Sequence, residues 1–135
     1  MSKPSAGTYI LYLRVLSPSG AKLALTWKSS DNTVNLEPLT GDGSQKWSIK
    51  DYNATTQSIS PSNDANKQIG FGNGGLSVLP SGGYVFQFRS SDSGYTISDG
   101  AASVFWQADN AVDHVRVTTG GKSTDEKQRW ILEKQ

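Results

Sequence analysis

Several kinds of chemistry are ruled out by what this 135-residue chain lacks. It has no cysteine and a single histidine, His114, which excludes disulfides, thiol catalysis and metal sites built from His/Cys clusters. Its 13 basic and 12 acidic residues give a formal net charge of +1, so nothing indicates binding to nucleic acid or to an acidic membrane. No apolar run approaches the roughly 20 residues of a membrane-spanning helix. We therefore expect no cofactor, no metal and no membrane insertion.

The beginning of the sequence also lacks the apolar stretch of a secretory signal. It reads Met-Ser-Lys-Pro-Ser-Ala-Gly, which predicts a cytoplasmic protein. A chain of 135 residues is long enough for one hydrophobic core, so we expect a single domain spanning residues 1–135. No long apolar edge indicates an interface, which leaves monomer and dimer both open.

A recurring segment is the most informative feature that is present. Gln45-Lys46-Trp47 and Gln128-Arg129-Trp130 each open a strand-like run, and Tyr84-Val85-Phe86 occupies the corresponding place between them. The aromatic residues fall at positions 47, 86 and 130, in steps of 39 and 44 residues. A second marker recurs at similar steps, as Gly7-Thr8-Tyr9-Ile10, Thr56-Gln57-Ser58-Ile59 and Gly94-Tyr95-Thr96-Ile97. Such a period is typical of one repeated unit that cannot bury its apolar face alone.

The pattern between these markers is that of short β-strands. Apolar and polar residues alternate in brief runs, glycine-rich and proline-containing turns separate them, and no window shows sustained helical periodicity. Four runs fall in each of three repeats, approximately 6–52, 53–92 and 93–135. We therefore predict an all-β fold, a β-trefoil. In the run 84–88, alternation places Tyr84, Phe86 and Phe88 on one face, so Phe86 is expected to be partly structural.

Catalytic arrangements are poorly supported. His114 lies beside Asp113 in a context typical of a strand rim, and we interpret it as a surface residue rather than a general base. The twelve acidic residues show no spacing that favours a glycosidase pair. Residues 70–75 fit Gly-x-Gly-x-x-Gly, but the sequence continues as another strand rather than a helix, which excludes the nucleotide-binding interpretation. These glycines instead predict a tight loop that holds Phe71 outward.

The stretch from Phe71 to Phe86 combines apolar side chains with five intervening glycines. Aromatic rings cover the C–H faces of sugars, while accessible backbone groups pair with sugar hydroxyls. The stretch therefore supplies both ingredients of a carbohydrate-binding site. The alternative, that these apolar residues fill the core, stays open on composition alone.

The order of motifs along the whole chain resembles the fungal fruiting-body lectins of the ricin-B-like β-trefoil type. The resemblance begins with Gly7-Thr8-Tyr9-Ile10-Leu11-Tyr12 and continues to residue 26, and it returns at 68–72, 78–80, 83–86, 94–100 and 129–134. It implies a non-enzymatic lectin that recognises a fucosylated, GlcNAc-containing glycan, the chitobiose core of N-glycans on glycoproteins. It also implies a role in fungal defence against nematodes or insects.

The resemblance further implies one ligand site, built mainly by the second repeat. Its residues would be Tyr52, Phe71, Leu79, Gly83, Tyr84, Val85 and Phe86. Phe71 and Phe86 stand where the family pattern has tryptophan, and Gly83 where it has asparagine. These changes are compatible with an affinity about tenfold lower, because a lost hydrogen bond costs about 0.5–1.5 kcal/mol. They are equally compatible with an altered specificity.

A β-trefoil protease inhibitor is the alternative function. It would act through one protruding loop, for which residues 28–32, 60–67 and 120–127 are the candidates.

Overall fold

The regular secondary structure of the described residues consists of twelve short strands and two single-turn 3-10 helices. The computed structural model describes residues 3–72, 75–91, 94–101, 103–121 and 126–135. Residues 73–74 of the glycine motif and 122–125 of the third candidate inhibitor loop lie outside the described residues. The strands are β1 (Gly7–Leu13), β2 (Leu23–Lys28), β3 (Thr33–Pro38), β4 (Trp47–Asp51), β5 (Gln57–Pro61), β6 (Lys67–Gly72), β7 (Gly75–Pro80), β8 (Phe86–Ser91), β9 (Gly94–Asp99), β10 (Phe105–Ala108), β11 (Val117–Gly120) and β12 (Trp130–Lys134). The helices are η1 (Gly43–Gln45) and η2 (Glu126–Gln128).

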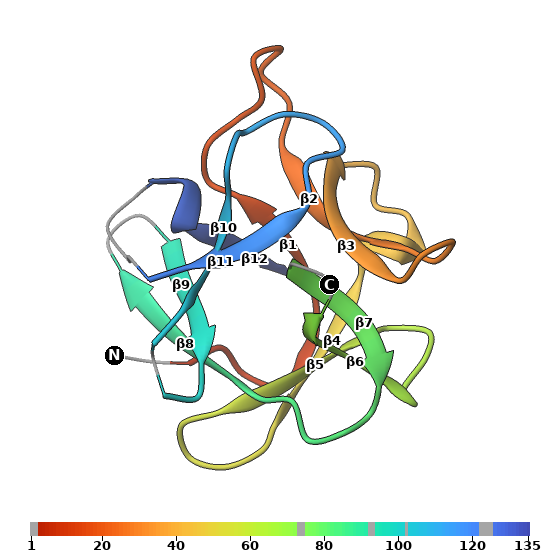
Figure 1. The fold of residues 1–135 in the computed structure, drawn as a ribbon, viewed down its shortest axis with the longest axis vertical. Helices are drawn as coiled ribbons and strands as arrows, with labels where there is room; N and C mark the ends of the chain where they lie inside the picture. Colours follow the sequence, from red (N-terminus) through yellow and green to blue (C-terminus); the bar gives the residue numbers. More distant parts are fainter. Residues whose placement is uncertain (1–2, 73–74, 92–93, 102, 122–125) are drawn as a thin grey trace.

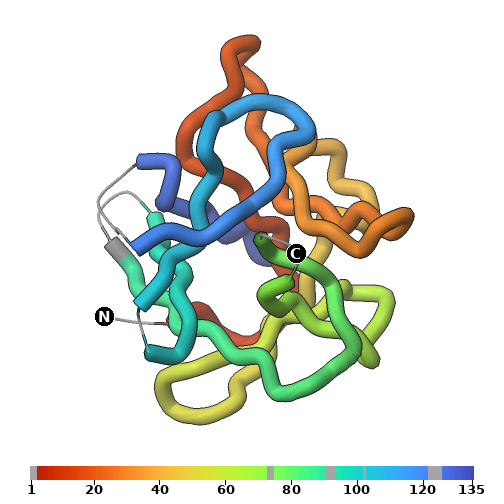
Figure 2. The backbone as a smooth tube through the Cα atoms, in the orientation of Figure 1, coloured from red at the N-terminus to blue at the C-terminus, as the bar shows by residue number. Residues whose placement is uncertain are grey.

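Six strands form a closed antiparallel barrel. Around the ring, β1 pairs with β4, β4 with β5, β5 with β8, β8 with β9, β9 with β12, and β12 with β1. The remaining six form the hairpins β2–β3, β6–β7 and β10–β11. The chain thus winds around a common centre in three segments, red to orange, yellow to green, and cyan to blue (Figures 1 and 2). This arrangement confirms the predicted all-β class and the β-trefoil.

The three hairpins also contact one another. Thr33 of β3 pairs with Ser77 of β7. Asn35 of β3 forms an isolated bridge with Arg116, immediately before β11. Each hairpin is therefore held in place partly by residues of another repeat.

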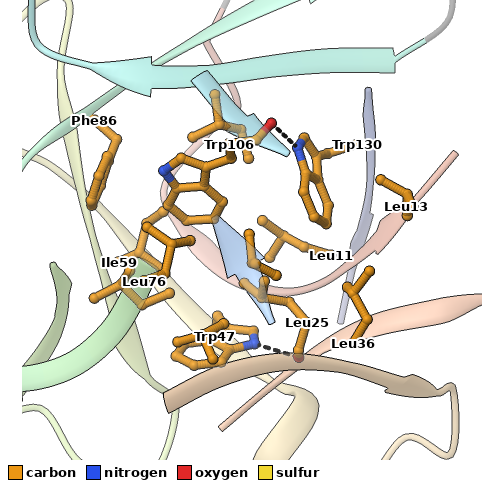
Figure 3. Close-up of a cluster of buried hydrophobic side chains, with 14 of the residues drawn as sticks. Leu11, Leu13, Leu25, Leu36, Trp47, Ile59, Leu76, Phe86, Trp106 and Trp130 are labelled. Atoms are coloured by element: carbon orange, nitrogen blue, oxygen red, sulfur yellow. Dashed lines mark hydrogen bonds between the residues drawn. The ribbon is translucent and has the colours of Figure 1, made fainter. Parts of the chain in front are cut away.

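The core aromatics Trp47, Phe86 and Trp130 begin β4, β8 and β12, and all three are buried. The indole N–H of Trp47 donates to the carbonyl of Leu25 at 2.9 Å, and that of Trp130 donates to the carbonyl of Trp106 at 3.3 Å. Phe86 has no such donor. Its ring packs edge-to-face against Trp106 with centroids 5.0 Å apart, and the indole nitrogen of Trp106 lies on the side that faces Phe86 (Figure 3).

The register of the barrel corrects the second sequence marker. Tyr9 pairs with Trp47, Gln57 with Phe86 and Tyr95 with Trp130, so these three partners are equivalent. Two residues later come Leu11, Ile59 and Ile97, each 0% exposed. The sequence marker placed Ile10 in that set. It is wrong by one residue, because successive side chains of a strand point to opposite faces.

One strand begins later than the alternation predicts. Strand β8 begins at Phe86, so Tyr84 and Val85 precede it. Gly83 just before them has φ +83°, a left-handed conformation that interrupts an extended strand. Phe86 and Phe88 do share the buried face. Within the described residues, neither helix is of a length and apolarity that would cross a bilayer.

Candidate functional site

The β6–β7 hairpin divides the residues predicted to form the site between its two faces. Phe71 pairs with Leu76, Gly70 with Ser77, and Gln68 with Leu79. Because side chains alternate along a strand, Phe71 lies on the face that includes the core residue Ile69. Gln68, Gly70 and Leu79 lie on the opposite, outer face.

Phe71 ends a series of aromatic contacts that runs from the surface into the core. It is 41% exposed, and its ring meets that of Phe86 edge-to-face with centroids 5.6 Å apart. Phe86 in turn contacts Trp106, which contacts Trp130 at 6.3 Å. Phe86 is only 1% exposed, so it supports Phe71 from beneath and presents almost no surface of its own.

Tyr84 and Leu79 cover the outer face. A Cβ atom at Gly70 would lie 2.9 Å from Leu79 Cδ1 and 3.0 Å from Cγ and Cδ1 of Tyr84. Both side chains therefore occupy the space that a side chain at position 70 would need. The Tyr84 ring is half-exposed and rests on the backbone of β6.

The backbone that carries Tyr84 is fixed by Gln68. Its Oε1 accepts hydrogen bonds from the backbone N–H of Gly82 at 3.2 Å and of Tyr84 at 3.3 Å. In the sequence, Gln68 and Gly70 lay within the motifs of the family resemblance but were not among the predicted site residues. Comparison of the repeats could have identified Gly70, which stands where the first repeat has Thr26.

The other two repeats show what has changed here. Gln45 and Gln128, at the position of Tyr84, are both buried. The amide of Gln45 donates to Thr26 Oγ1, and that of Gln128 donates to Gln107 Oε1. Thr26 is the fourth residue of β2, as Gly70 is of β6. The second repeat therefore replaces a part-buried polar pair with a glycine and a half-buried aromatic ring.

The remaining predicted residues, Gly83, Val85 and Tyr52, lie in the β7–β8 and β4–β5 connections. Nothing lies within 4 Å of the Cβ position of Gly83, so its backbone is open to an approaching ligand. Val85 and Thr56 both lie next to Gly100, with Cγ2 atoms 3.9 and 3.8 Å from its Cβ position. Tyr52 is 66% exposed in the β4–β5 connection, where its N–H donates to the Thr56 carbonyl at 3.0 Å. The structure thus pairs Phe71 with Phe86 and Leu79 with Tyr84, and it leaves Tyr52 on a neighbouring turn.

A comparison with protein families decides the classification. The sequence matches the CCL2 lectin-like family over residues 7–130. The chain belongs to the CCL2-like lectin family. It is thus a carbohydrate-binding lectin. A separate comparison with curated protein sequences gives no match.

Solved structures share the fold of this CCL2-like chain at low sequence identity. An agglutinin from Rhizoctonia solani is 16% identical with a TM-score of 0.77, over 100% of this chain and 99% of that one. A ricin B-like lectin from Macrolepiota procera, solved with lactose, is 11% identical with a TM-score of 0.77, over 100% of both chains. A mosquitocidal holotoxin is 13% identical with a TM-score of 0.84, but this chain spans only 18% of its length.

The single histidine of the CCL2-like chain lies at the surface beside one carboxylate. The His114 side chain is 79% exposed and its Nδ1 lies 2.7 Å from Oε1 of Glu37, in a turn where His114 has φ +67°. No cluster of three potential metal ligands occurs among the described residues. Over the same residues the surface forms no enclosed pocket, so a ligand would lie across the side chains and not inside the protein.

Two of the candidate inhibitor loops are short turns closed by an ion pair. Lys28 Nζ lies 3.7 Å from Asp31 in the β2–β3 turn, and Lys67 Nζ lies 3.4 Å from Asp64 in the β5–β6 turn. Neither of these compact turns gives a reason to prefer protease inhibition over carbohydrate binding.

Proposed function

We propose that the protein binds a fucosylated, GlcNAc-containing glycan of the N-glycan chitobiose core. The contact surface would comprise Tyr52, Phe71, Leu79, Gly83, Tyr84 and Val85, with Phe86 beneath Phe71. The observation that carries the proposal is the half-exposed Tyr84 ring, held over Gly70 and next to the open backbone of Gly83.

The chemistry of such a glycan suits an open aromatic surface. Sugar C–H faces and the methyl group of fucose bury apolar area against rings and against Leu79 and Val85. Sugar hydroxyls can pair with backbone groups near Gly83, where no side chain intervenes. The exposed ring of Phe71 adds a second stacking surface on the opposite face of the same hairpin.

A glycan array that includes N-glycan cores with and without α1,3-fucose tests the proposed ligand. Selective binding to the fucosylated cores is the expected result. Binding to an unrelated set of glycans would support the lectin function and contradict the proposed ligand. If no glycan bound, inhibition assays with serine and cysteine proteases would test the alternative function.

The Tyr84→Ala variant tests the proposed surface. We expect it to abolish detectable binding to the fucosylated core, because it removes the ring that the Gly70 backbone supports, while the far-UV spectrum and melting temperature stay close to wild type. The matched control is Tyr12→Ala, which removes a half-buried ring of β1 that contacts Lys22 at 4.9 Å from Nζ to the centroid. Unchanged binding by Tyr84→Ala would reject this surface.

We further propose a cytoplasmic protein that serves in fungal defence against nematodes or insects. In support, a mosquitocidal holotoxin contains a segment of the same fold. Feeding assays with wild type and Tyr84→Ala test this role. Equal toxicity of the two proteins would show that toxicity does not depend on glycan binding at this surface.

A further inference from the structure

We propose that Arg116, in the third repeat, is a positioning residue for the glycan site and acts by fixing the β6–β7 hairpin that carries Phe71. The inference rests on the proposed function. It makes the site a joint product of all three repeats.

The guanidinium of Arg116 donates several hydrogen bonds to the β6–β7 hairpin. Its Nη2 donates to the Gly72 carbonyl at 2.7 Å, to the Leu76 carbonyl at 3.0 Å and to Ser77 Oγ at 2.8 Å. Its Nε lies 3.3 Å from the same Leu76 carbonyl. Ser77 is 2% exposed, and its hydroxyl donates to the Gly72 carbonyl at 3.0 Å. One cation thus joins both strands of the hairpin.

These acceptors flank Phe71. Gly72 follows it in β6, and Leu76 is its partner across the hairpin. Phe71 is the penultimate residue of β6, next to the end of the strand where Gly72 pairs with Gly75. The orientation of its exposed ring therefore depends on the contacts that Arg116 makes around it.

The first repeat anchors the backbone of Arg116. The N–H of Leu36 in β3 donates to the Val115 carbonyl at 2.9 Å, and His114 N–H donates to the Leu36 carbonyl at 2.7 Å. The hairpin also approaches β11 closely, since a Cβ at Gly75 would lie 2.7 Å from the Val117 carbonyl oxygen. Arg116 consequently connects a fixed backbone on one side to the Phe71 hairpin on the other.

A lysine cannot reproduce this geometry. The planar guanidinium presents several N–H donors in a fixed fork, whereas an ammonium is a compact point charge on a flexible stem. Arg116→Lys should therefore keep the charge and lose the orientation, and Arg116→Met should lose both.

Titration with the α1,3-fucosylated chitobiose core tests the inference. Arg116→Met should bind the glycan about tenfold more weakly than wild type, the loss of affinity expected when charge-assisted hydrogen bonds are removed. Arg116→Lys should have an affinity between those of wild type and Arg116→Met. The exposed Arg89 of β8 supplies the control, and Arg89→Met should bind like wild type. In a Phe71→Ala background, Arg116→Met should cause no additional loss. An equal loss in both backgrounds would overturn the inference.

A second readout does not depend on the ligand. The chain has four phenylalanines, so fluorophenylalanine labelling should give four ¹⁹F resonances, and Phe71→Ala assigns the one that disappears. Arg116→Lys, as well as Arg116→Met, should shift or broaden the Phe71 resonance. If wild type bound no glycan, the proposed function would fail while this shift would still support the positioning of Phe71. An unchanged Phe71 resonance in a folded variant would overturn it.

Discussion

A methyl group at position 70 would lie 2.9 Å from Leu79 and 3.0 Å from the ring of Tyr84. Carbon atoms essentially never approach so closely, so at least one of these side chains would have to move. At the scale of single residues, the proposed surface therefore depends on the absence of a side chain as much as on the rings themselves. Glycine is needed at position 70 for packing and not for backbone conformation, because the φ of Gly70 is not left-handed.

Gly70→Ala tests this dependence. We expect a loss of glycan affinity of about tenfold or more, since overpacking of about 1–3 kcal/mol would displace Tyr84 and Leu79. Gly72→Ala in the same strand is the matched control, because its Cβ would meet nothing closer than Ser77 Oγ at 3.7 Å. Titration calorimetry and melting curves compare the two. Equal affinities would show that the Tyr84 ring does not need its place over Gly70.

Some of this residue-level detail could be predicted from the sequence. The core aromatics recur after similar turns, so Trp47, Phe86 and Trp130 could be identified by repetition. The role of Gln68 could not, because its amide fixes backbone groups 14 and 16 residues away, and no local pattern encodes such a pairing. The family resemblance implied that Phe86 is a site residue. Its side chain is 1% exposed and packs against Phe71, so in the proposed site it would lie beneath that ring.

At the scale of the elements, the β9–β10 connection depends on one carboxylate. Asp99 Oδ1 accepts from the N–H groups of Ser103 at 2.7 Å and Val104 at 3.2 Å, and Oδ2 accepts from Ser103 Oγ at 2.6 Å. Burial is the largest single influence and raises the pKa of Asp99, but the hydrogen bonds from Ser103 and Val104 together outweigh it. The pKa of Asp99 therefore lies below its ordinary value of 3.8.

A lowered carboxyl pKa stabilises the fold above the ordinary value, and this contribution is lost as pH falls through the folded-state pKa. Asp99→Asn should thus be less stable than wild type at neutral pH, and the difference should shrink as the pH falls below the ordinary carboxyl pKa of 3.8. Urea unfolding at a series of pH values measures it. Asp113→Asn, on a different and exposed turn, is the control. A difference that stayed constant with pH would contradict this role of the Asp99 charge.

Element boundaries were the less predictable part of the fold. Alternation identified a strand through Tyr84, but β8 begins at Phe86 because Gly83 adopts φ +83° before it. The marker that aligned Ile10 with Ile59 and Ile97 was displaced by one residue because three short motifs can be aligned in more than one register. Only the pairing of Tyr9, Gln57 and Tyr95 with the core aromatics fixes the alignment.

At the scale of the whole molecule, the barrel joins the three repeats through shared ladders. The pairs β4–β5, β8–β9 and β12–β1 each connect strands from different repeats. An aromatic contact also crosses between repeats, since Phe86 of the second repeat packs against Trp106 of the third. A single repeat would therefore leave both unpaired strand edges and apolar faces in water.

Trp130→Ala tests whether the three repeats unfold as one unit. The side chain is 0% exposed and donates to the Trp106 carbonyl, so its removal should cost about 3–5 kcal/mol, a large part of the stability of a domain this size. Unfolding followed by tryptophan fluorescence and by far-UV circular dichroism should still give coincident transitions, because β12 pairs with both β1 and β9. Trp27→Phe, at a half-buried position in β2, should shift the midpoint much less. If the first two repeats instead kept a separate transition after the third had unfolded, the barrel ladders would not couple the repeats, and Arg116 could not transmit an anchor in the first repeat to a site in the second.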